Sequence, residues 1–147
     1  MERHTNSRIR ILVVEDHDPF RRHICSVLDD LPHLQVVGSC DDGSRAVQQA
    51  RVLHPDIILL DIGLPGISGL EAARRIREVA PLAKIIFLTQ ESSPEVVEDA
   101  FSIGALGYVL KANAGSELVG ALDSVAREQR FLGWGVATYA AANPRHK

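Results

Sequence analysis

Short aliphatic runs alternate with longer amphipathic runs along this chain, and this alternation constrains the fold more than any other feature. The short runs are Ile9–Val14, Leu34–Gly38, Asp56–Leu60, Lys84–Leu88 and Leu106–Leu110. A run without polar interruption, such as Ile57-Ile58-Leu59-Leu60, is typical of a strand that is buried on both faces. Regular strand–helix alternation favours a parallel sheet covered by helices on both sides. We therefore predict an α/β fold with a doubly wound, five-stranded parallel sheet.

The segments between these runs carry helix start signals. Asp18-Pro19 predicts an N-cap followed by a proline at the first helical position. Ser68 with Glu71 three residues later predicts a capping box. Ser93-Pro94 predicts the start of a helix that continues to about residue 103, Asn113 predicts the cap of the last helix, and a less clearly patterned helix is expected over 43–53. Helical spacing predicts three inward-facing sets: Phe20, Ile24, Val27, Leu28 and Leu31; Leu70, Ala73, Ile76 and Val79; and Leu118, Leu122 and Val125.

Length, charge and composition limit the classes of protein that this chain can belong to. The 147 residues fit one domain with short tails, and the formal net charge of -3 argues against a protein that coats nucleic acid. No apolar run approaches the ~18 residues of a membrane span. The first ten residues are polar and basic and lack the apolar core of a signal peptide. Isolated Cys25 and Cys40 are expected to be free thiols, so we predict a soluble cytoplasmic protein.

Polar residues stand at the ends of the predicted strands. The first strand ends in Glu15-Asp16, the third in Asp61, the fourth in Thr89 and the fifth in Lys111. In open parallel sheets, ligands bind beyond the carboxyl ends of the strands, where the strand order reverses. We therefore expect three carboxylates, one hydroxyl and one ammonium to converge at one edge of the sheet.

This combination of groups indicates phosphoryl chemistry with a metal ion. Clustered carboxylates repel one another unless a cation lies among them, and oxygen ligands suit Mg²⁺. A carboxylate can act as the nucleophile in phosphoryl transfer, while Lys111 and Thr89 could contact phosphoryl oxygens. The loop 62–69, with three glycines and one proline, fits a tight turn that leaves a backbone carbonyl free for the metal. Taken singly, each feature also has an ordinary explanation, as a helix-start acidic pair, a solvated lysine, a strand residue or a plain turn.

Four motifs together resemble the receiver domain of two-component response regulators. They are Ile11–His17, Asp61–Gly69, Leu88-Thr89 and Gly107–Lys111, and the resemblance extends over about residues 8–127. It implies the flavodoxin-like (βα)5 fold with strand order 2-1-3-4-5.

The resemblance also implies a role for each site residue. Asp61 would be the phosphoacceptor, and Asp16 and Asp61 would bind Mg²⁺ directly together with the backbone carbonyl of Gly63. Glu15 would act through a metal-bound water. Thr89 and Lys111 would sense the phosphoryl group.

Further positions would govern the switch and its lifetime. Tyr108 would be the switch aromatic that turns inward as Thr89 moves. The fourth helix, fifth strand and fifth helix would form the output face. Gly63, Gln90 and Glu91 occupy positions thought to tune dephosphorylation.

The segment 107–112 is similar to the NarL/FixJ subfamily, whose members usually continue into a helix-turn-helix DNA-binding domain. We predict a flexible tail over residues 1–8, a receiver domain over 9–130 and a linker or tail over 131–147. That last segment could also pack back on the domain or extend a helix. The expected partners are a histidine kinase, a second copy of the chain after phosphorylation, and DNA only through a further domain. Whether the chain is a piece of a longer regulator or a stand-alone receiver stays open.

Three other functions compete with a phosphorylation switch that controls transcription. Phosphatases with an aspartyl nucleophile usually carry a second Asp two residues on, where this chain has Gly63, so we do not expect an enzyme that turns over a free substrate. A nucleotide- or flavin-binding module is disfavoured because no glycine-rich phosphate motif follows the first strand. A receiver fold that works by contact without phosphorylation is supported only by Gln90, which could partly cover the site.

Overall fold

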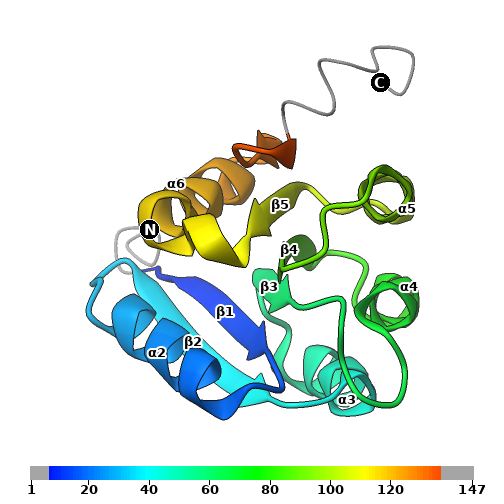
Figure 1. Cartoon of the computed structure of the whole chain (residues 1–147). Coiled ribbons are helices and arrows are strands. Elements are labelled where there is room, and N and C mark those ends of the chain that lie inside the picture. The colour runs from blue at the N-terminus through cyan, green and yellow to red at the C-terminus, as the bar shows by residue number, and fades with distance from the viewer. Residues whose placement is uncertain (1–6, 137–147) are drawn as a thin grey trace.

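The computed structural model describes residues 7–136 and has three layers, a parallel sheet between two layers of helices (Figure 1). The predicted N-terminal tail and C-terminal linker fall mostly on residues 1–6 and 137–147, which lie outside the described residues. None of the described helices is long and apolar enough to cross a membrane.

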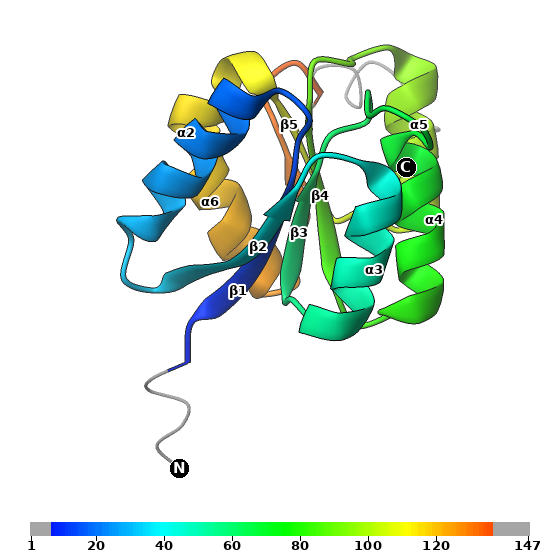
Figure 2. The ribbon, with the colours of Figure 1, turned by 90° about the horizontal axis from the view of Figure 1, so that it is seen from below.

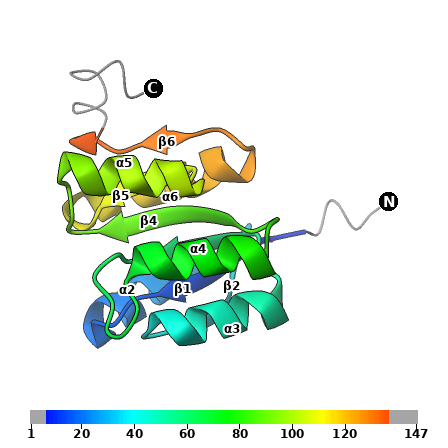
Figure 3. The same ribbon diagram turned by 90° about the vertical axis from the view of Figure 1, so that its right-hand side faces the viewer.

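The sheet confirms the predicted topology and adds one strand to it. Its strands are β1 (Ile9–Val14), β2 (Leu34–Cys40), β3 (Ile57–Leu60), β4 (Lys84–Thr89), β5 (Gly107–Leu110) and β6 (Phe131–Leu132). They run in the order β2-β1-β3-β4-β5-β6, and all neighbouring pairs are parallel. The first five strands have the expected order 2-1-3-4-5, and the two-residue strand β6 extends the sheet beyond β5 (Figure 3).

Helices cover both faces of the sheet. On one face lie α2 (Asp18–Asp29) and α6 (Ala114–Ala126), and on the other lie α3 (Gly43–Leu53), α4 (Gly69–Val79) and α5 (Pro94–Ile103) (Figure 2). A short 3-10 helix, η1 (Lys111–Asn113), joins β5 to α6. This division is the doubly wound arrangement that right-handed β-α-β crossovers produce.

The start of α4 confirms half of the predicted capping box. Ser68 is the N-cap, and its hydroxyl accepts a hydrogen bond from the backbone N–H of Glu71 at 3.2 Å. The carboxylate of Glu71 instead accepts hydrogen bonds from Arg74 and Arg75, one turn further on. Both contacts favour the helix, since each stabilises its first turns.

The predicted N-cap of α2 is wrong by one residue. His17 is the N-cap, and Asp18 lies inside the first turn, where it forms an ion pair with Arg21 at 2.6 Å. The backbone N–H of His17 donates to the carboxylate of Glu15, so that side chain orders the chain just before the helix. A carboxylate such as Asp18 is favourable in the first turn because it faces the positive end of the helix dipole. Ser93 and Asn113 stand at the predicted cap positions without a side-chain capping bond.

The core lies on both sides of the sheet. In β1, Leu12 and Val14 pack toward α3, α4 and α5, whereas Ile11 and Val13 pack toward α2 and α6. The central strands are therefore buried on both faces, as their uninterrupted apolar sequences predict. One predicted inward residue is wrong, because Val27 is 37% exposed on the outer part of α2.

Residues 131–136 pack back onto the domain, which resolves one of the open alternatives for this part of the chain. The backbone N–H groups of Phe131 and Gly133 donate to the carbonyls of Leu106 and Tyr108, both at 2.9 Å. Val136 is only 2% exposed, and Trp134 is exposed. The segment therefore continues the sheet at its β5 edge.

A glycine determines how closely α4 approaches the end of β3. Gly69, the first residue of α4, donates its N–H to the carbonyl of Ile62 at 2.8 Å. A Cβ at position 69 would lie 1.9 Å from the backbone oxygen of Asp61 and 2.6 Å from the Cα of Ile62. Any side chain here would push the helix away from Asp61 or displace the backbone of Asp61 itself.

We expect Gly69→Ala to destabilise the fold by about 1–3 kcal/mol, the usual cost of overpacking against a backbone that cannot move freely. Gly120→Ala is the matched control, because Gly120 lies in α6, where an added Cβ would meet no packed neighbour within 4 Å. That change should stabilise the protein by up to about 1 kcal/mol, since alanine is the better helix former. Urea unfolding measures both, and equal effects of the two variants would contradict this account.

We also expect Gly133→Ala to loosen β6 without unfolding the domain. A Cβ on Gly133 would lie 2.7 Å from Oε1 of Glu117 and 3.0 Å from the backbone oxygen of Tyr108. Amide hydrogen exchange at Phe131 and Gly133 should become about tenfold faster or more, because their strand bonds open locally. Exchange in β3 is the internal control. Unchanged exchange at residues 131 and 133 would show that the sheet tolerates a side chain there.

Candidate functional site

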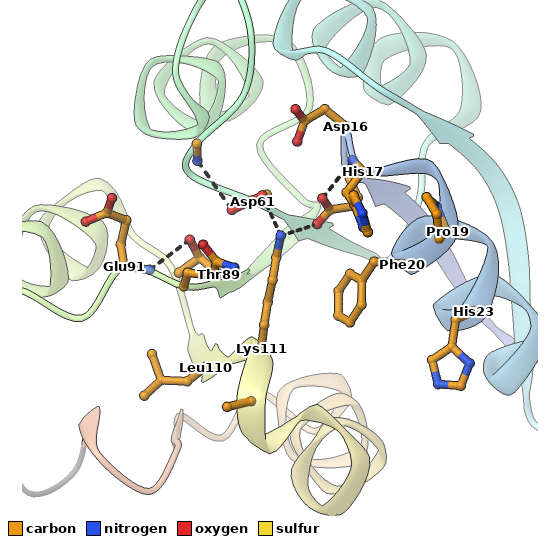
Figure 4. Close-up of a pocket in the computed structure, with 14 residues that line it drawn as sticks. Asp16, His17, Pro19, Phe20, His23, Asp61, Thr89, Glu91, Leu110 and Lys111 are labelled. Atoms are coloured by element: carbon orange, nitrogen blue, oxygen red, sulfur yellow. Dashed lines mark hydrogen bonds and ion pairs between the residues drawn. The ribbon is translucent and has the colours of Figure 1, made fainter.

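Parallel register brings the predicted site residues to one edge of the sheet. Val14 pairs with Leu60, so β1 and β3 end at the same level, and Leu60 pairs with Phe87. The strands β4 and β5 continue two residues further, to the paired Thr89 and Leu110. The residues that follow therefore meet around one pocket of about 920 Å³. Every site residue named from the sequence lines this pocket except Tyr108: Glu15, Asp16, Asp61, Gly63, Thr89, Gln90, Glu91 and Lys111. Figure 4 shows Lys111 extending across it toward Asp61.

Lys111 forms two short ion pairs at the floor of the pocket. Its Nζ lies 2.8 Å from Oε1 of Glu15 and 2.9 Å from Oδ2 of Asp61. Both carboxylates are nearly buried, with Glu15 3% and Asp61 5% exposed. Buried charges persist only when they are paired and hydrogen-bonded. The lysine is therefore the group that permits two carboxylates to be buried side by side.

Backbone contacts hold each carboxylate in place. The second oxygen of Glu15 accepts the N–H of His17 at 3.0 Å, and Oδ1 of Asp61 accepts the N–H of Gly63 at 3.3 Å. The guanidinium of Arg21 donates to the backbone carbonyl of Glu15 at 2.8 Å and thereby ties α2 to the end of β1. The site is built from rigid strand ends and the first turn of a helix, with little dependence on long loops.

Burial and the hydrogen bonds between charged groups have opposite effects on the pKa values of Glu15 and Lys111. Burial raises the pKa of Glu15 above its ordinary value, and the hydrogen bonds from Lys111 and His17 only partly offset that effect. For Lys111, burial alone would lower the pKa. The hydrogen bonds to Glu15 and Asp61 outweigh it, so the pKa is raised and the lysine stays charged at neutral pH.

The pocket keeps an excess of negative charge that suits a metal ion. One ligand oxygen from each of Glu15, Asp16 and Asp61 can lie within 4.8 Å of the others. Lys111 compensates one of the three carboxylates, and the exposed carboxylate of Asp16 has no ion pair or hydrogen bond with any residue of the described chain. An all-oxygen donor set with two uncompensated charges fits a hard divalent cation. The acidic triad is thus consistent with the metal site of a receiver.

A second group of contacts joins Thr89, Glu91 and Tyr108. The hydroxyl of Thr89, which is 1% exposed, accepts the N–H of Glu91 at 3.3 Å. Tyr108 is fully buried, and its hydroxyl donates to the backbone carbonyl of Glu91 at 2.7 Å. Burial raises the pKa of Tyr108, with further contributions from the charges of Glu91 and Asp61, so the phenol remains protonated. The loop after β4 is therefore held from both sides, by Thr89 and by an inward-pointing Tyr108.

Sequence reasoning missed Phe20 as a residue of this pocket. The helical pattern assigns Phe20 to the core, yet its half-buried ring lines the pocket, with its centroid 5.1 Å from Nζ of Lys111. Its position in the sequence indicates this placement, because Phe20 lies in the first turn of the helix that follows Glu15-Asp16 and is therefore beside the strand ends. Gln90 and Glu91 are exposed at the rim.

Comparisons with known proteins agree with this geometry. The family described as "Response regulator receiver domain" matches residues 11–123. Response regulator GacA of Pseudomonas viridiflava is 39% identical over 124 residues, which make up 84% of this chain and 58% of that protein. Response regulator UvrY of Escherichia coli K12 is 36% identical over 90% of this chain and 61% of its own length. The chain thus spans about three fifths of the curated relatives that it matches.

Solved structures lead to the same family. The two-component response regulator of the LuxR family from Aurantimonas sp. SI85-9A1 superposes with a TM-score of 0.89 at 32% identity, covering 95% of this chain and 99% of that one. Together with the sheet order and the acidic triad, these matches establish the family. The chain belongs to the response regulator receiver domains of two-component systems.

Proposed function

We propose that this domain accepts a phosphoryl group on Asp61 from a histidine kinase and thereby switches a transcriptional output. The observation that carries the proposal is the nearly buried Asp61 carboxylate, whose Oδ2 lies 2.9 Å from the ammonium of Lys111 at the edge of an acidic pocket. A carboxylate in this setting is a competent nucleophile for phosphoryl transfer. The receiver family membership supports the same reaction.

The proposed chemistry needs a divalent cation, which we take to be Mg²⁺. Asp16, Asp61 and the backbone carbonyl of Gly63 would hold it directly, and Glu15 would hold it through water. When bound, the ion would neutralise negative charge on the incoming phosphoryl group. Gly63 is exposed and lines the pocket, so its backbone is accessible from it.

In the proposed reaction, a carboxylate oxygen of Asp61 attacks phosphorus while the bond from phosphorus to the donor breaks. The donor is a phosphohistidine of the kinase, whose ring nitrogen leaves with the electron pair. Lys111 would move its hydrogen bond from Asp61 to a phosphoryl oxygen, and the hydroxyl of Thr89 would donate to another. The domain would catalyse only its own phosphorylation and dephosphorylation, so we do not propose a free-substrate enzyme.

Thr89 and Tyr108 would transmit the change. If the hydroxyl of Thr89 turns to a phosphoryl oxygen, it gives up the N–H of Glu91, and the loop between β4 and α5 loses one of its two restraints. Tyr108 would then retain that loop through the Glu91 carbonyl. This shift in population would alter α5, β5 and α6, the proposed output face.

The relatives support a proposal for the wider setting of the domain. The predicted boundary between receiver and linker at residue 130 shifts, because residues 131–136 pack on the domain. A cytoplasmic receiver that includes this segment, followed by a linker beyond it, would form a homodimer when phosphorylated. It would reach DNA only through a separate helix-turn-helix domain. A LuxR-family structure from Staphylococcus aureus, 26% identical with a TM-score of 0.76 over 80% of this chain and 98% of that chain, is described as a DNA-binding response regulator. That description supports a transcriptional output.

Intact-mass analysis after incubation with acetyl phosphate and Mg²⁺ tests the acceptor directly. We expect one phosphoryl adduct on the parent protein and none on Asp61→Asn or in the presence of a chelator, because both remove a component of the reaction. Circular dichroism should show that Asp61→Asn is folded. A folded parent without an adduct would contradict the proposal and favour a receiver that works by contact alone.

Glu91 should tune the lifetime of the phosphorylated state. Its side chain is exposed beside the site, two residues after Thr89, where a carboxylate can orient an attacking water. We expect Glu91→Ala to lose its phosphoryl group several-fold more slowly than the parent. Glu95→Ala, a matched change in the first turn of α5, should leave the rate unchanged. Identical dephosphorylation rates for parent and Glu91→Ala would refute this role.

A further inference from the structure

Lys111 has a third neighbour besides its two carboxylates. The ring of Phe20 lies beside its ammonium, with 5.1 Å between Nζ and the ring centroid (Figure 4). The side chain of Lys111 is 16% exposed, so this cation–π contact is partly shielded from water. The face of an aromatic ring attracts a cation, and the attraction grows as water is removed. Three groups therefore contact the ammonium, two charged carboxylates and one neutral ring.

Phe20 is held in place by contacts that do not involve Lys111. Its neighbour Arg21 donates its backbone N–H to the carbonyl of His17 and its guanidinium to the carbonyl of Glu15. The same guanidinium pairs with Asp18. The first turn of α2 is thus tied to the end of β1, and the ring of Phe20 also packs against the core on that face of the sheet. The position of the ring is therefore fixed by contacts other than the one with the lysine.

Lys111 cannot keep both of its carboxylate contacts unchanged throughout the proposed reaction. Asp61 becomes the acceptor, and Glu15 belongs to the acidic triad that fits a cation. The ring of Phe20 carries no net charge and no ligand oxygen, so it takes no part in holding a metal ion and does not repel a phosphoryl group as a carboxylate would. It is the contact that Lys111 can keep while its hydrogen bonds are exchanged.

We propose that Phe20 is a positioning residue, whose ring holds the ammonium of Lys111 over the pocket beside Asp61. This inference rests on the proposed function, because the value of that placement is the contact with a phosphoryl oxygen. Phe20 acts through Lys111 and does not touch the reacting atoms. A leucine would fill much of the same space but offer no ring face to the cation.

The contact itself can be measured in the metal-free parent protein. The sequence contains three lysines, Lys84, Lys111 and Lys147, so selective ¹³C labelling of lysine gives three Cε–Hε signals. The ring should shift the Lys111 Hε signal upfield of its value in urea, and Lys111→Arg identifies that signal by its loss. An Hε signal at the unfolded position in the folded parent would overturn the proposal, whatever the variants do.

Two variants then distinguish the effect of the aromatic ring face from the effect of side-chain volume. Phe20→Leu should lose the upfield shift and slow phosphorylation by acetyl phosphate about three- to tenfold, the scale of a partly buried cation–π contact. Phe20→Tyr should keep the shift and remain within about twofold of the parent, since it retains the ring face. Phe131→Leu is the matched control, a half-buried phenylalanine in β6 away from the pocket, and should leave the rate unchanged.

The outcomes distinguish this role from a packing role and from failure of the proposed function. Equal slowing by Phe20→Leu and Phe20→Tyr would overturn the proposal, because the ring would then not matter. Parent-like rates in both variants would overturn it as well. A parent that shows the upfield shift but takes no phosphoryl group would refute the function of Asp61 while leaving the lysine placement intact.

Discussion

Two carboxylates can be buried next to each other in this domain because one ammonium lies between them. Lys111 bonds Glu15 and Asp61, which come from different strands and are 46 residues apart in the chain. Removing a cation from such a group leaves buried charges that neither water nor protein compensates. The burial of these two carboxylates and the residual negative charge of the pocket depend on this one side chain, while the backbone N–H groups of His17 and Gly63 help to orient them.

The sheet supplies the precision that these ion pairs need. The parallel sheet places the carboxyl ends of β1, β3, β4 and β5 at one edge, so short backbone segments are enough to deliver the polar groups. Gly69 then lets α4 approach the carbonyl of Asp61 without an intervening side chain. Charged groups placed on strand ends and helix starts are held more tightly than groups on long loops. The acidic triad therefore needs no loop closure to form.

The sequence predicts much of this arrangement because its signals are strong where burial is complete. Uninterrupted aliphatic runs such as Ile57–Leu60 are typical of strands buried on both faces, and parallel order then brings their ends together. The N-cap of α2 is harder to place because local capping rules accept several polar residues. The deciding contact is the bond from His17 to Glu15.

Two other features escape prediction for related physical reasons. Helical spacing shows which side of α2 faces inward, but not that Phe20 reaches past the core to Lys111. The strand β6 is only two residues long and is followed by Gly133, so no periodicity marks it. Both features depend on long-range neighbours that local patterns do not record. The roles in phosphoryl transfer remain predictions.

The short strand β6 changes what the β5 side of the domain can offer to another molecule. An unpaired strand edge presents a row of N–H and C=O groups that any extended peptide can join. Here the carbonyls of Leu106 and Tyr108 already accept bonds from Phe131 and Gly133. No foreign strand can extend the sheet at β5 without first displacing this segment. Among the described residues, the edge left for backbone pairing is the two-residue strand β6. A partner on that side would therefore depend mainly on the side chains of α5, α6 and the exposed Trp134, which can be specific in a way that backbone pairing is not.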